Sequence, residues 1–314
     1  MSTSRVVLAG GSGFLGRAVA GALLAAGHEV LVLTRRSSPL DILGTPVFWD
    51  PSAPGDWSQV LDGAAAVVNL AGRSIRCRHT PANRSEIIRS RVESVRTLAE
   101  AIRRCRQPPR AWIQASATGI YGDSGDRVCD ESTPAGAGFL AETCLEWERA
   151  FHEQATPGVR RVVLRLGIVL GRDGGALPPL AGLARGFLGG SAGSGRQYMS
   201  WLHVADARRI FQESIRREDL GGTYVAASPG PVANAEFMRQ LRAVLHRPWC
   251  PPAPAMAVRL GAWAMGVDAS LALTGQRCVP RGLLDAGFSF EQPEIRGALE
   301  DLLRGGRMRS PLTA

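Results

Sequence analysis

The chain has 314 residues, of which 45% are hydrophobic and 21% are charged, a composition typical of a globular protein with a large core. The formal net charge is +9, and all 37 basic residues are arginines spread over many segments. Such scatter indicates compositional bias and not a binding stripe, so we expect no nucleic-acid partner.

Membrane and secretory signals are absent from the sequence. No apolar run reaches membrane-spanning length, and a strand begins directly after Met1-Ser2-Thr3-Ser4. We therefore expect no membrane partner, no signal peptide and a cytoplasmic location. The six cysteines are scattered without a C-x-x-C pair, which predicts free thiols and neither a structural metal nor a disulfide framework.

The first predicted elements are a strand at residues 5–9, a glycine-rich turn and a helix that runs to residue 26. A second strand at 29–34 completes a βαβ unit, in which such a turn binds the pyrophosphate of a dinucleotide at the helix N-terminus. The alternative is an ordinary flexible turn. We predict that the cofactor-binding residues of the turn are Gly10, Gly11, Ser12, Gly13, Phe14, Leu15 and Gly16.

The end of the second strand indicates which dinucleotide is bound. An NAD-binding chain usually has a carboxylate there for the ribose 2′-hydroxyl, whereas this chain has Thr34-Arg35-Arg36. Guanidinium groups pair with a 2′-phosphate, so Arg35 and Arg36 predict NADP(H). The alternative is that both arginines are ordinary solvated residues.

Further strands are predicted at residues 46–50 and 65–72. Ligands of a doubly wound sheet lie outside the carboxyl ends of its strands, so Leu70, Ala71 and Gly72 are expected to border the cofactor. Asp50, at the end of the preceding strand, is a candidate for the adenine end. A long amphipathic helix at 83–105 has its arginines mostly on the solvated face. Arg91 could point towards the phosphates, but packing alone explains this segment.

The next strand, from residue 111, runs into Ser116-Ala117-Thr118-Gly119-Ile120-Tyr121-Gly122. With the glycine turn and Asn69-Leu70-Ala71-Gly72, this segment resembles the extended short-chain dehydrogenases/reductases. More of the chain is similar to their atypical "epimerase family" subgroup, in the segments Phe139 to Cys144, Arg165 to Gly171, Gly193 to Gln197, Ser200 to Asp206, Gln276 to Pro280 and Gly287 to Phe290. The resemblance implies a Rossmann-like α/β fold, a doubly wound parallel sheet with a smaller C-terminal substrate lobe.

One feature of the wider superfamily is missing. Its members use a tyrosine as general acid/base and a lysine one helical turn later, but this chain has no lysine. The resemblance places Leu140 or Glu142 near the tyrosine position and Cys144 or Glu146 near the lysine position. The candidates for the missing catalytic role are Ser116, Thr118, Tyr121, Glu142 and Cys144. Each also has a structural alternative, such as a hydrogen bond at a strand end or simple packing.

The domain boundaries follow from the same resemblance. We expect an NADP-binding domain over residues 1–170, with sheet elements returning around 196–230, a substrate lobe mainly over 171–306, and a disordered tail at 307–314. A loop of the lobe is expected to close over the substrate and to offer Arg196, Gln197, Tyr198 and Trp201.

We therefore predict an NADP(H)-dependent oxidoreductase or epimerase-like enzyme that acts on a small carbonyl, alcohol or sugar-type substrate. The alternatives are an NADP(H)-binding regulatory protein and a non-redox isomerase or cyclase, because fold does not determine function. The expected partner is a small-molecule substrate. Homodimers are common among the proteins that this chain resembles, so a homodimer is a further expectation.

Overall fold

A computed structural model describes residues 4–35 and 42–304 of the chain. Its centre is a seven-stranded sheet in the order β11-β7-β5-β4-β1-β2-β3, and every neighbouring pair is parallel. The strands are β1 (Arg5–Ala9), β2 (Glu29–Thr34), β3 (Thr45–Phe48), β4 (Ala66–Asn69), β5 (Ala111–Ala117), β7 (Arg160–Leu166) and β11 (Gly222–Ala226). This arrangement confirms the expected Rossmann-like α/β fold.

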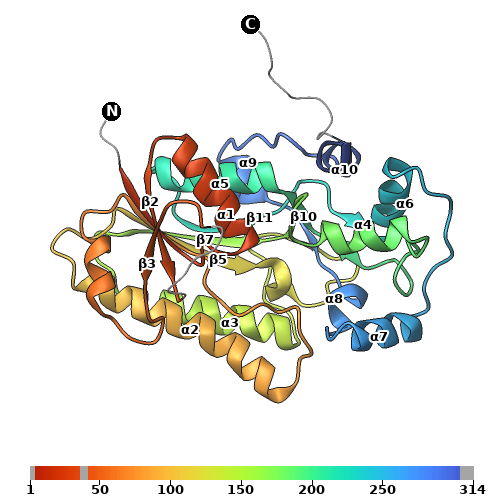
Figure 1. Ribbon diagram of the computed structural model, residues 1–314, viewed down its shortest axis with the longest axis horizontal. Coiled ribbons are helices and arrows are strands. Elements are labelled where there is room, and N and C mark those ends of the chain that lie inside the picture. The colour runs from red at the N-terminus through yellow and green to blue at the C-terminus, as the bar shows by residue number, and fades with distance from the viewer. Residues whose placement is uncertain (1–3, 36–41, 305–314) are drawn as a thin grey trace, which may run out of the picture.

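Helices cover both faces of the sheet, α1 (Phe14–Ala25) and α5 (Val204–Arg216) on one and α2 (Pro81–Arg103) and α3 (Phe139–His152) on the other (Figure 1). Alternate residues of β1 supply the two cores. Val6 and Leu8 pack with the α1 and α5 side, and Val7 and Ala9 with the α2 and α3 side. Burial on both faces explains why the central strands are continuous apolar runs.

The start of α2 shows why its predicted boundary was late. The helix begins at Pro81, two residues before the expected start, because the Thr80 side chain accepts a hydrogen bond from the N–H of Asn83 and caps the first turn. Proline is favoured at the first helical position, where no N–H partner is needed.

The chain order reverses at β1, which has β4 on one side and β2 on the other. Such a reversal leaves a crevice outside the carboxyl ends of the strands, where ligands of doubly wound sheets bind. The turn after β1, the end of β4 and the end of β5 all lie at this edge.

A second group of helices packs beside the sheet around a core that contains Trp201 and Phe237. Its helices are α4 (Leu177–Arg185), α6 (Asn234–Val244) and α10 (Ile295–Arg304), and α7 (Ala255–Ala264) and α8 (Ser270–Leu273) lie near the start of α3 (Figure 1). The remaining elements are short: η1 (Asp56–Leu61), η2 (Thr118–Tyr121), β6 (Val128–Cys129), β8 (Ile168–Leu170), β9 (Tyr198–Met199), β10 (Trp201–His203), β12 (Val232–Ala233), β13 (Arg277–Cys278) and α9 (Arg281–Asp285).

Three expectations from the sequence concern the C-terminal tail, membranes and the location of the protein. The expected disordered tail at 307–314 lies outside the described residues. Within the part of the chain that the structure describes, no helix is both long and apolar enough to cross a membrane. The cytoplasmic location stays a prediction.

Candidate functional site

The glycine turn after β1 is packed so closely that a side chain at Gly10 or Gly16 would collide with backbone atoms. Gly10 has φ +83°, and a Cβ placed on it would lie 2.7 Å from the backbone carbonyl of Leu70 at the end of β4. A Cβ on Gly16 would lie 2.4 Å from the carbonyl oxygen of Gly10. The turn is therefore fixed against β4 and against itself, as a rigid anion-binding turn requires.

Gly13 differs from these two because its front is open. A Cβ there would meet only the Gly10 carbonyl oxygen, at 3.6 Å. Gly13 is also the N-cap of α1 and provides no side-chain cap, so the first N–H groups of the helix have no capping partner from that residue. An open approach to uncapped N–H groups fits the pyrophosphate of a dinucleotide.

The side chains of the turn have different surroundings. Ser12 is exposed, and its carbonyl oxygen accepts a hydrogen bond from Arg17. The Phe14 ring lies against Gly171 and Gly174, where a Cβ on either glycine would come within 2.3 Å of it. Phe14 thus packs the turn against the loop after β8.

The predicted 2′-phosphate site is only partly described. Arg35 is exposed at the end of β2, while Arg36 lies outside the described residues. The hydrogen bond from Arg89 and the nearby charges of Arg73 and Arg35 lower the pKa of Glu86 against the effect of its desolvation. Arg35 and Arg73 therefore both contribute positive potential on this side of the crevice.

Asp50 lies beyond the end of β3, in a turn of its own. Its carboxylate accepts hydrogen bonds from the Ser52 hydroxyl and N–H, and these bonds lower its pKa. Asp50 is exposed, and Trp49 before it donates its backbone N–H to Thr34 at the end of β2. The aspartate is therefore engaged in its own turn beside the predicted adenine side.

The end of β4 is held by a buried side-chain network. Asn69 accepts a hydrogen bond from the Ala71 N–H and donates its amide to Gln114 on β5. The Leu70 carbonyl touches Gly10, and Gly72 lies against the Arg91 side chain. The predicted residues Leu70, Ala71 and Gly72 therefore lie next to the glycine turn.

Ser116 and Tyr121 belong to a buried network that fully engages their hydroxyl groups. The Ser116 hydroxyl donates to Glu148 at 2.6 Å, and Glu148 forms a two-point ion pair with Arg165. Arg165 donates to the Tyr121 hydroxyl, which in turn donates to the carbonyl oxygen of Asp130. Burial raises the pKa of Tyr121 well above its usual range. These contacts indicate structural roles for Ser116 and Tyr121.

Thr118, Glu142 and Cys144 have three different environments. Thr118 is buried beside Gly119, and its hydroxyl has no hydrogen-bond partner among the described residues. Glu142 is exposed in the first turn of α3 and faces solvent. Cys144 is buried, and burial raises the pKa of its thiol to about 11, so it is a neutral thiol near pH 7.

The geometry around Gly119 determines which side of α3 faces the end of β5. A Cβ on Gly119 would lie 3.4 Å from the Leu140 Cβ and 3.8 Å from the Cys144 sulfur. Glu146 instead pairs with Arg149 on the outer side of the helix. Of the two registers that the sequence left open, the pair Leu140 and Cys144 faces the sheet edge.

A pocket of about 210 Å³ lies beside Leu140, between the start of α3 and the turn before α8. Its ionisable lining side chains among the described residues are His79, Arg84, Asp123 and Asp268. The Arg84 guanidinium stacks on the Phe139 ring, and the His79 ring packs on the same phenyl group. The pocket therefore joins the sheet edge to the smaller group of helices.

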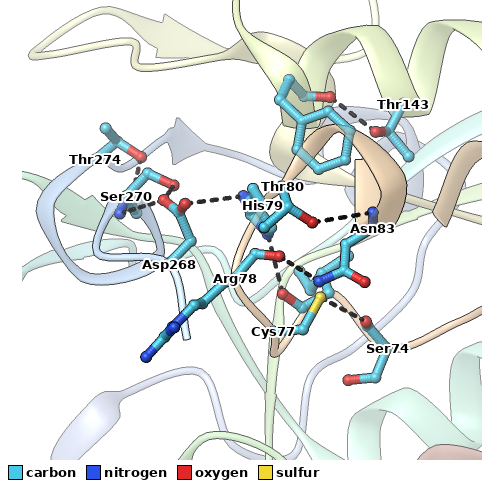
Figure 2. A network of polar contacts seen from close by, with 12 residues as sticks. Ser74, Cys77, Arg78, His79, Thr80, Asn83, Thr143, Asp268, Ser270 and Thr274 are labelled. Carbon is cyan, nitrogen blue, oxygen red and sulfur yellow. Dashed lines mark hydrogen bonds and ion pairs between the residues drawn. The ribbon is translucent and has the colours of Figure 1, made fainter. Parts of the chain in front are cut away.

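His79 and Asp268 face each other across this pocket (Figure 2). His79 Nε2 lies 3.0 Å from the Ile75 carbonyl oxygen, and its Nδ1 lies 3.7 Å from an Asp268 carboxylate oxygen. Burial would raise the pKa of Asp268, but hydrogen bonds from Ser270 and the charge of His79 outweigh it and lower that pKa. Asp268 is thus a carboxylate directed at His79, a pair that the sequence analysis missed because 189 positions separate the two residues.

The predicted substrate loop requires correction. Trp201 is fully buried, and its indole N–H donates to the Gly230 carbonyl oxygen, so its ring belongs to the core. The Gln197 amide is buried and donates to the carbonyl oxygens of Ala192 and Ala272. Both side chains are engaged by the fold and are not available to bind a ligand.

The other two residues of that loop are more accessible. Arg196 is exposed, 3.7 Å from Asp126, and Tyr198 is partly buried under the Arg277 guanidinium. None of the four loop residues is among the described residues that line the 210 Å³ pocket.

Comparison with known proteins is consistent with this geometry. Residues 6–227 match the model of the NAD dependent epimerase/dehydratase family. The chain belongs to this family. In this epimerase-family chain, residues 253–302 also match a domain of unknown function, DUF1731, which contains the Asp268 side of the pocket.

Relatives of this epimerase-family chain span nearly its whole length. An epimerase family protein from Mycobacterium bovis is 38% identical over 95% of this chain and 97% of its own. The crystal structure of human epimerase family protein SDR39U1 (isoform2) with NADPH has a TM-score of 0.85 and 32% identity, and the match covers 95% of this chain and 98% of that one.

A nucleoside-diphosphate sugar epimerase from Corynebacterium glutamicum has a TM-score of 0.78 and 33% identity, over 96% of this chain and 58% of its own. A relative from Arabidopsis thaliana that is 34% identical, over 96% of this chain and 88% of its own, is named chloroplastic.

Proposed function

We propose that this chain is an NADP(H)-dependent oxidoreductase or epimerase-like enzyme for a small carbonyl or alcohol compound. The observation that carries the proposal is the glycine turn, which is closed at Gly10 and Gly16 but open at Gly13 in front of the uncapped α1. Human SDR39U1, with a TM-score of 0.85 to this chain, was crystallised with NADPH, which supports the same cofactor here.

Different residues of this chain would hold different parts of the cofactor. The N–H groups of Phe14, Leu15 and Gly16 would hold the pyrophosphate, and Arg35 and Arg36 the 2′-phosphate. Leu70, Ala71 and Gly72 would border the nicotinamide half. The cofactor supplies the hydride chemistry when bound, and the protein supplies its orientation.

The structure favours Thr118 over Ser116 as the residue that binds the substrate oxygen. The Ser116 hydroxyl is engaged by Glu148, whereas the Thr118 hydroxyl is free among the described residues and adjoins Gly119, which lines the pocket. Thr118 could therefore donate to the oxygen of a carbonyl compound and orient its carbon.

His79 is the pocket residue best suited to move a proton. Its Nε2 faces a carbonyl oxygen, which can only accept, so Nε2 carries a hydrogen and Nδ1 faces the Asp268 carboxylate. A proton taken up at Nδ1 would be stabilised by the Asp268 carboxylate, which lies 3.7 Å away. We assign proton transfer to His79, because α3 presents Leu140 and Cys144 where the resemblance implies tyrosine and lysine.

The size of the pocket favours a small substrate. Its volume of about 210 Å³ is below the roughly 300–1,000 Å³ of sites that enclose drug-sized ligands. A small carbonyl or alcohol compound fits this volume better than a complete sugar nucleotide does.

The main alternative is an NADP(H)-binding regulatory protein in which no hydride moves. The presence of Leu140 and Cys144 where the resemblance implies tyrosine and lysine favours it. A pocket lined by His79 and by Gly119, the residue after Thr118, favours an enzyme. A non-redox isomerase or cyclase with a retained cofactor is a third possibility.

Label transfer separates these functions. Purified protein is incubated with NADPH that carries deuterium at C4 of the nicotinamide and with a panel of small aldehydes, ketones and sugar nucleotides. We expect deuterium in a product alcohol by mass spectrometry, and the Thr118→Val variant serves as the matched control. Saturable NADPH binding without label in any product would contradict the oxidoreductase proposal and favour the regulatory alternative.

A further inference from the structure

The Arg91 side chain leaves α2 towards the end of β4. One guanidinium nitrogen, Nη1, donates to the carbonyl oxygens of Arg73 and Ile87, both at 2.9 Å. The guanidinium also stacks on the Trp147 ring of α3, 4.9 Å from its centre. A Cβ on Gly72 would lie 3.1 Å from the guanidinium carbon, so Arg91 lies directly against the strand end at the crevice.

Arg91 differs from Arg89 of the same helix because its charge has no acidic partner. Arg89 pairs with Glu86, whereas no ion pair joins Arg91 to any described carboxylate. Desolvation lowers the pKa of Arg91, and the nearby Cys144 opposes this shift. A partly buried cation held only by two carbonyl oxygens and an aromatic ring lacks the compensation that such charges usually have.

Two of its donor groups are also free. Nε and Nη2 of Arg91 have no hydrogen-bond partner within residues 4–35 and 42–304, and neither atom is among the buried unsatisfied ones. The guanidinium therefore keeps donors for a ligand at the edge of the sheet.

The neighbours of Arg91 indicate which part of the ligand it would meet. Its guanidinium lies against Gly72, and the proposed function places Gly72 beside the nicotinamide half of NADP(H). The hydroxyl oxygens of the nicotinamide ribose are hydrogen-bond acceptors that the free guanidinium donors can bind. The Trp147 ring of α3 supports the guanidinium in this position.

We propose that Arg91 is a cofactor-positioning residue that donates hydrogen bonds to the ribose hydroxyl oxygens on the nicotinamide side of NADP(H). The resemblance implies a lysine on α3 near position 144, where this chain has a cysteine. Arg91 would supply the corresponding positive charge from α2. This inference rests on the proposed function, because it requires NADP(H) in the crevice.

The test uses two probes, NADPH and adenosine 2′,5′-bisphosphate, which contains the 2′-phosphate end but no nicotinamide ribose. Each is titrated into the wild-type protein, Arg91→Met, Arg91→Gln and the control Arg96→Met, with intrinsic fluorescence or calorimetry as the readout. Arg96 is an exposed arginine of the same helix that forms no ion pair with any described residue, so its variant controls for loss of a charge.

We expect Arg91→Met and Arg91→Gln to weaken NADPH binding about tenfold or more, as expected for hydrogen bonds to a charged group. Binding of adenosine 2′,5′-bisphosphate should change less than about twofold in both variants, which is the split that a purely structural role would not produce. The control variant should bind both probes as the wild type does.

Thermal unfolding of every variant shows whether it is folded. If Arg91→Met does not fold, the comparison is made with Arg91→Gln alone.

The outcomes separate the two proposals. If the wild type binds NADPH and both Arg91 variants bind it equally well, or lose both probes to the same degree, the role of Arg91 is contradicted while the proposed function stands. If the wild-type protein binds no NADPH, both proposals fail.

Discussion

The glycine turn after β1 and the segment after β5 lie at the same edge of the sheet, but they differ in the chemistry that they offer. In the turn, Gly10 and Gly16 are in contact with backbone atoms, and Gly13 leaves the approach to α1 open. After β5, the side chains that face Gly119 from α3 are the buried, neutral thiol of Cys144 and the apolar side chain of Leu140. The difference shows that the turn has the geometry of a cofactor site, whereas α3 presents neither a tyrosine nor a lysine towards the end of β5.

The largest effect should come from closing the turn. Gly16→Ala places a Cβ 2.4 Å from the Gly10 carbonyl oxygen and 2.6 Å from the Gly11 Cα, which are backbone atoms that cannot rotate away. We expect the free energy of unfolding to fall by about 2–4 kcal/mol, measured by urea denaturation, with loss of NADPH binding.

Gly182→Ala in α4 is the matched control, because no atom lies within 4 Å of its added Cβ. It should be neutral or stabilise the protein by up to about 1 kcal/mol. An equal loss in both variants would show that the close packing of the turn has no special importance.

A second substitution tests binding without disturbing the fold. Gly13→Ala adds a methyl group whose nearest protein atom is 3.6 Å away, and Gly13 has φ −76°, which alanine adopts readily. We expect the free energy of unfolding to change by less than about 1 kcal/mol, and NADPH affinity to fall about tenfold or more because the methyl group meets the phosphate. Unchanged affinity would place the pyrophosphate elsewhere.

The second region is tested through its two hydroxyl groups. Thr118→Val should lower kcat/KM about tenfold or more, because it removes the donor to the substrate oxygen, and leave stability nearly unchanged. Ser116→Ala should cost about 1–3 kcal/mol of stability, because Glu148 loses a buried hydrogen bond, with a smaller effect on turnover. The reverse pattern would return the substrate role to Ser116.

The smallest expected effect is a pH-dependent change in stability, which arises at His203, away from both regions. His203 caps α5 by accepting the Ala205 N–H at Nδ1, which places its hydrogen on Nε2 facing Asp301. Burial lowers the pKa of His203 despite the opposing effect of Asp301. Since the pKa of His203 is depressed in the folded state, the neutral imidazole contributes stability above about pH 6.5. That contribution to the free energy of unfolding is lost as pH falls through the folded-state pKa.

His203→Asn keeps a capping acceptor but cannot titrate in this range. Between pH 7.5 and 5.5 the wild type should lose more stability than the variant, by at most on the order of 1 kcal/mol, as measured by thermal unfolding. A larger loss in the variant would show that protonated His203 stabilises the fold.

Features that depend on neighbouring residues could be predicted from the sequence. The apolar runs, the glycine spacing and the arginines after β2 are local signals, and they led to the fold and to the cofactor hypothesis. The family resemblance placed the missing acid/base pair on the helix that the structure shows as α3, but it left two registers open. Only the packing of Leu140 and Cys144 against Gly119 separates them.

Other features were missed because they join distant parts of the chain. The network of Ser116, Glu148 and Arg165 spans two strands and a helix, and no periodic pattern reports such a contact. The pocket places His79 beside Asp268, which belongs to the C-terminal segment. Trp201 was expected at the substrate because the resemblance placed it in the loop that closes over the ligand. Its position in the core depends on how α4, α6 and α10 pack around it.

The central claim is that the turn and the arginines after β2 bind NADP(H), and a titration of the wild-type protein with NADPH and NADH tests it most directly. Nicotinamide fluorescence follows each cofactor under the same buffer and salt conditions. The account predicts saturable binding of one cofactor per chain, with NADPH about tenfold or more tighter than NADH because of its 2′-phosphate. Equal affinities, tighter binding of NADH or no binding of either cofactor would contradict it.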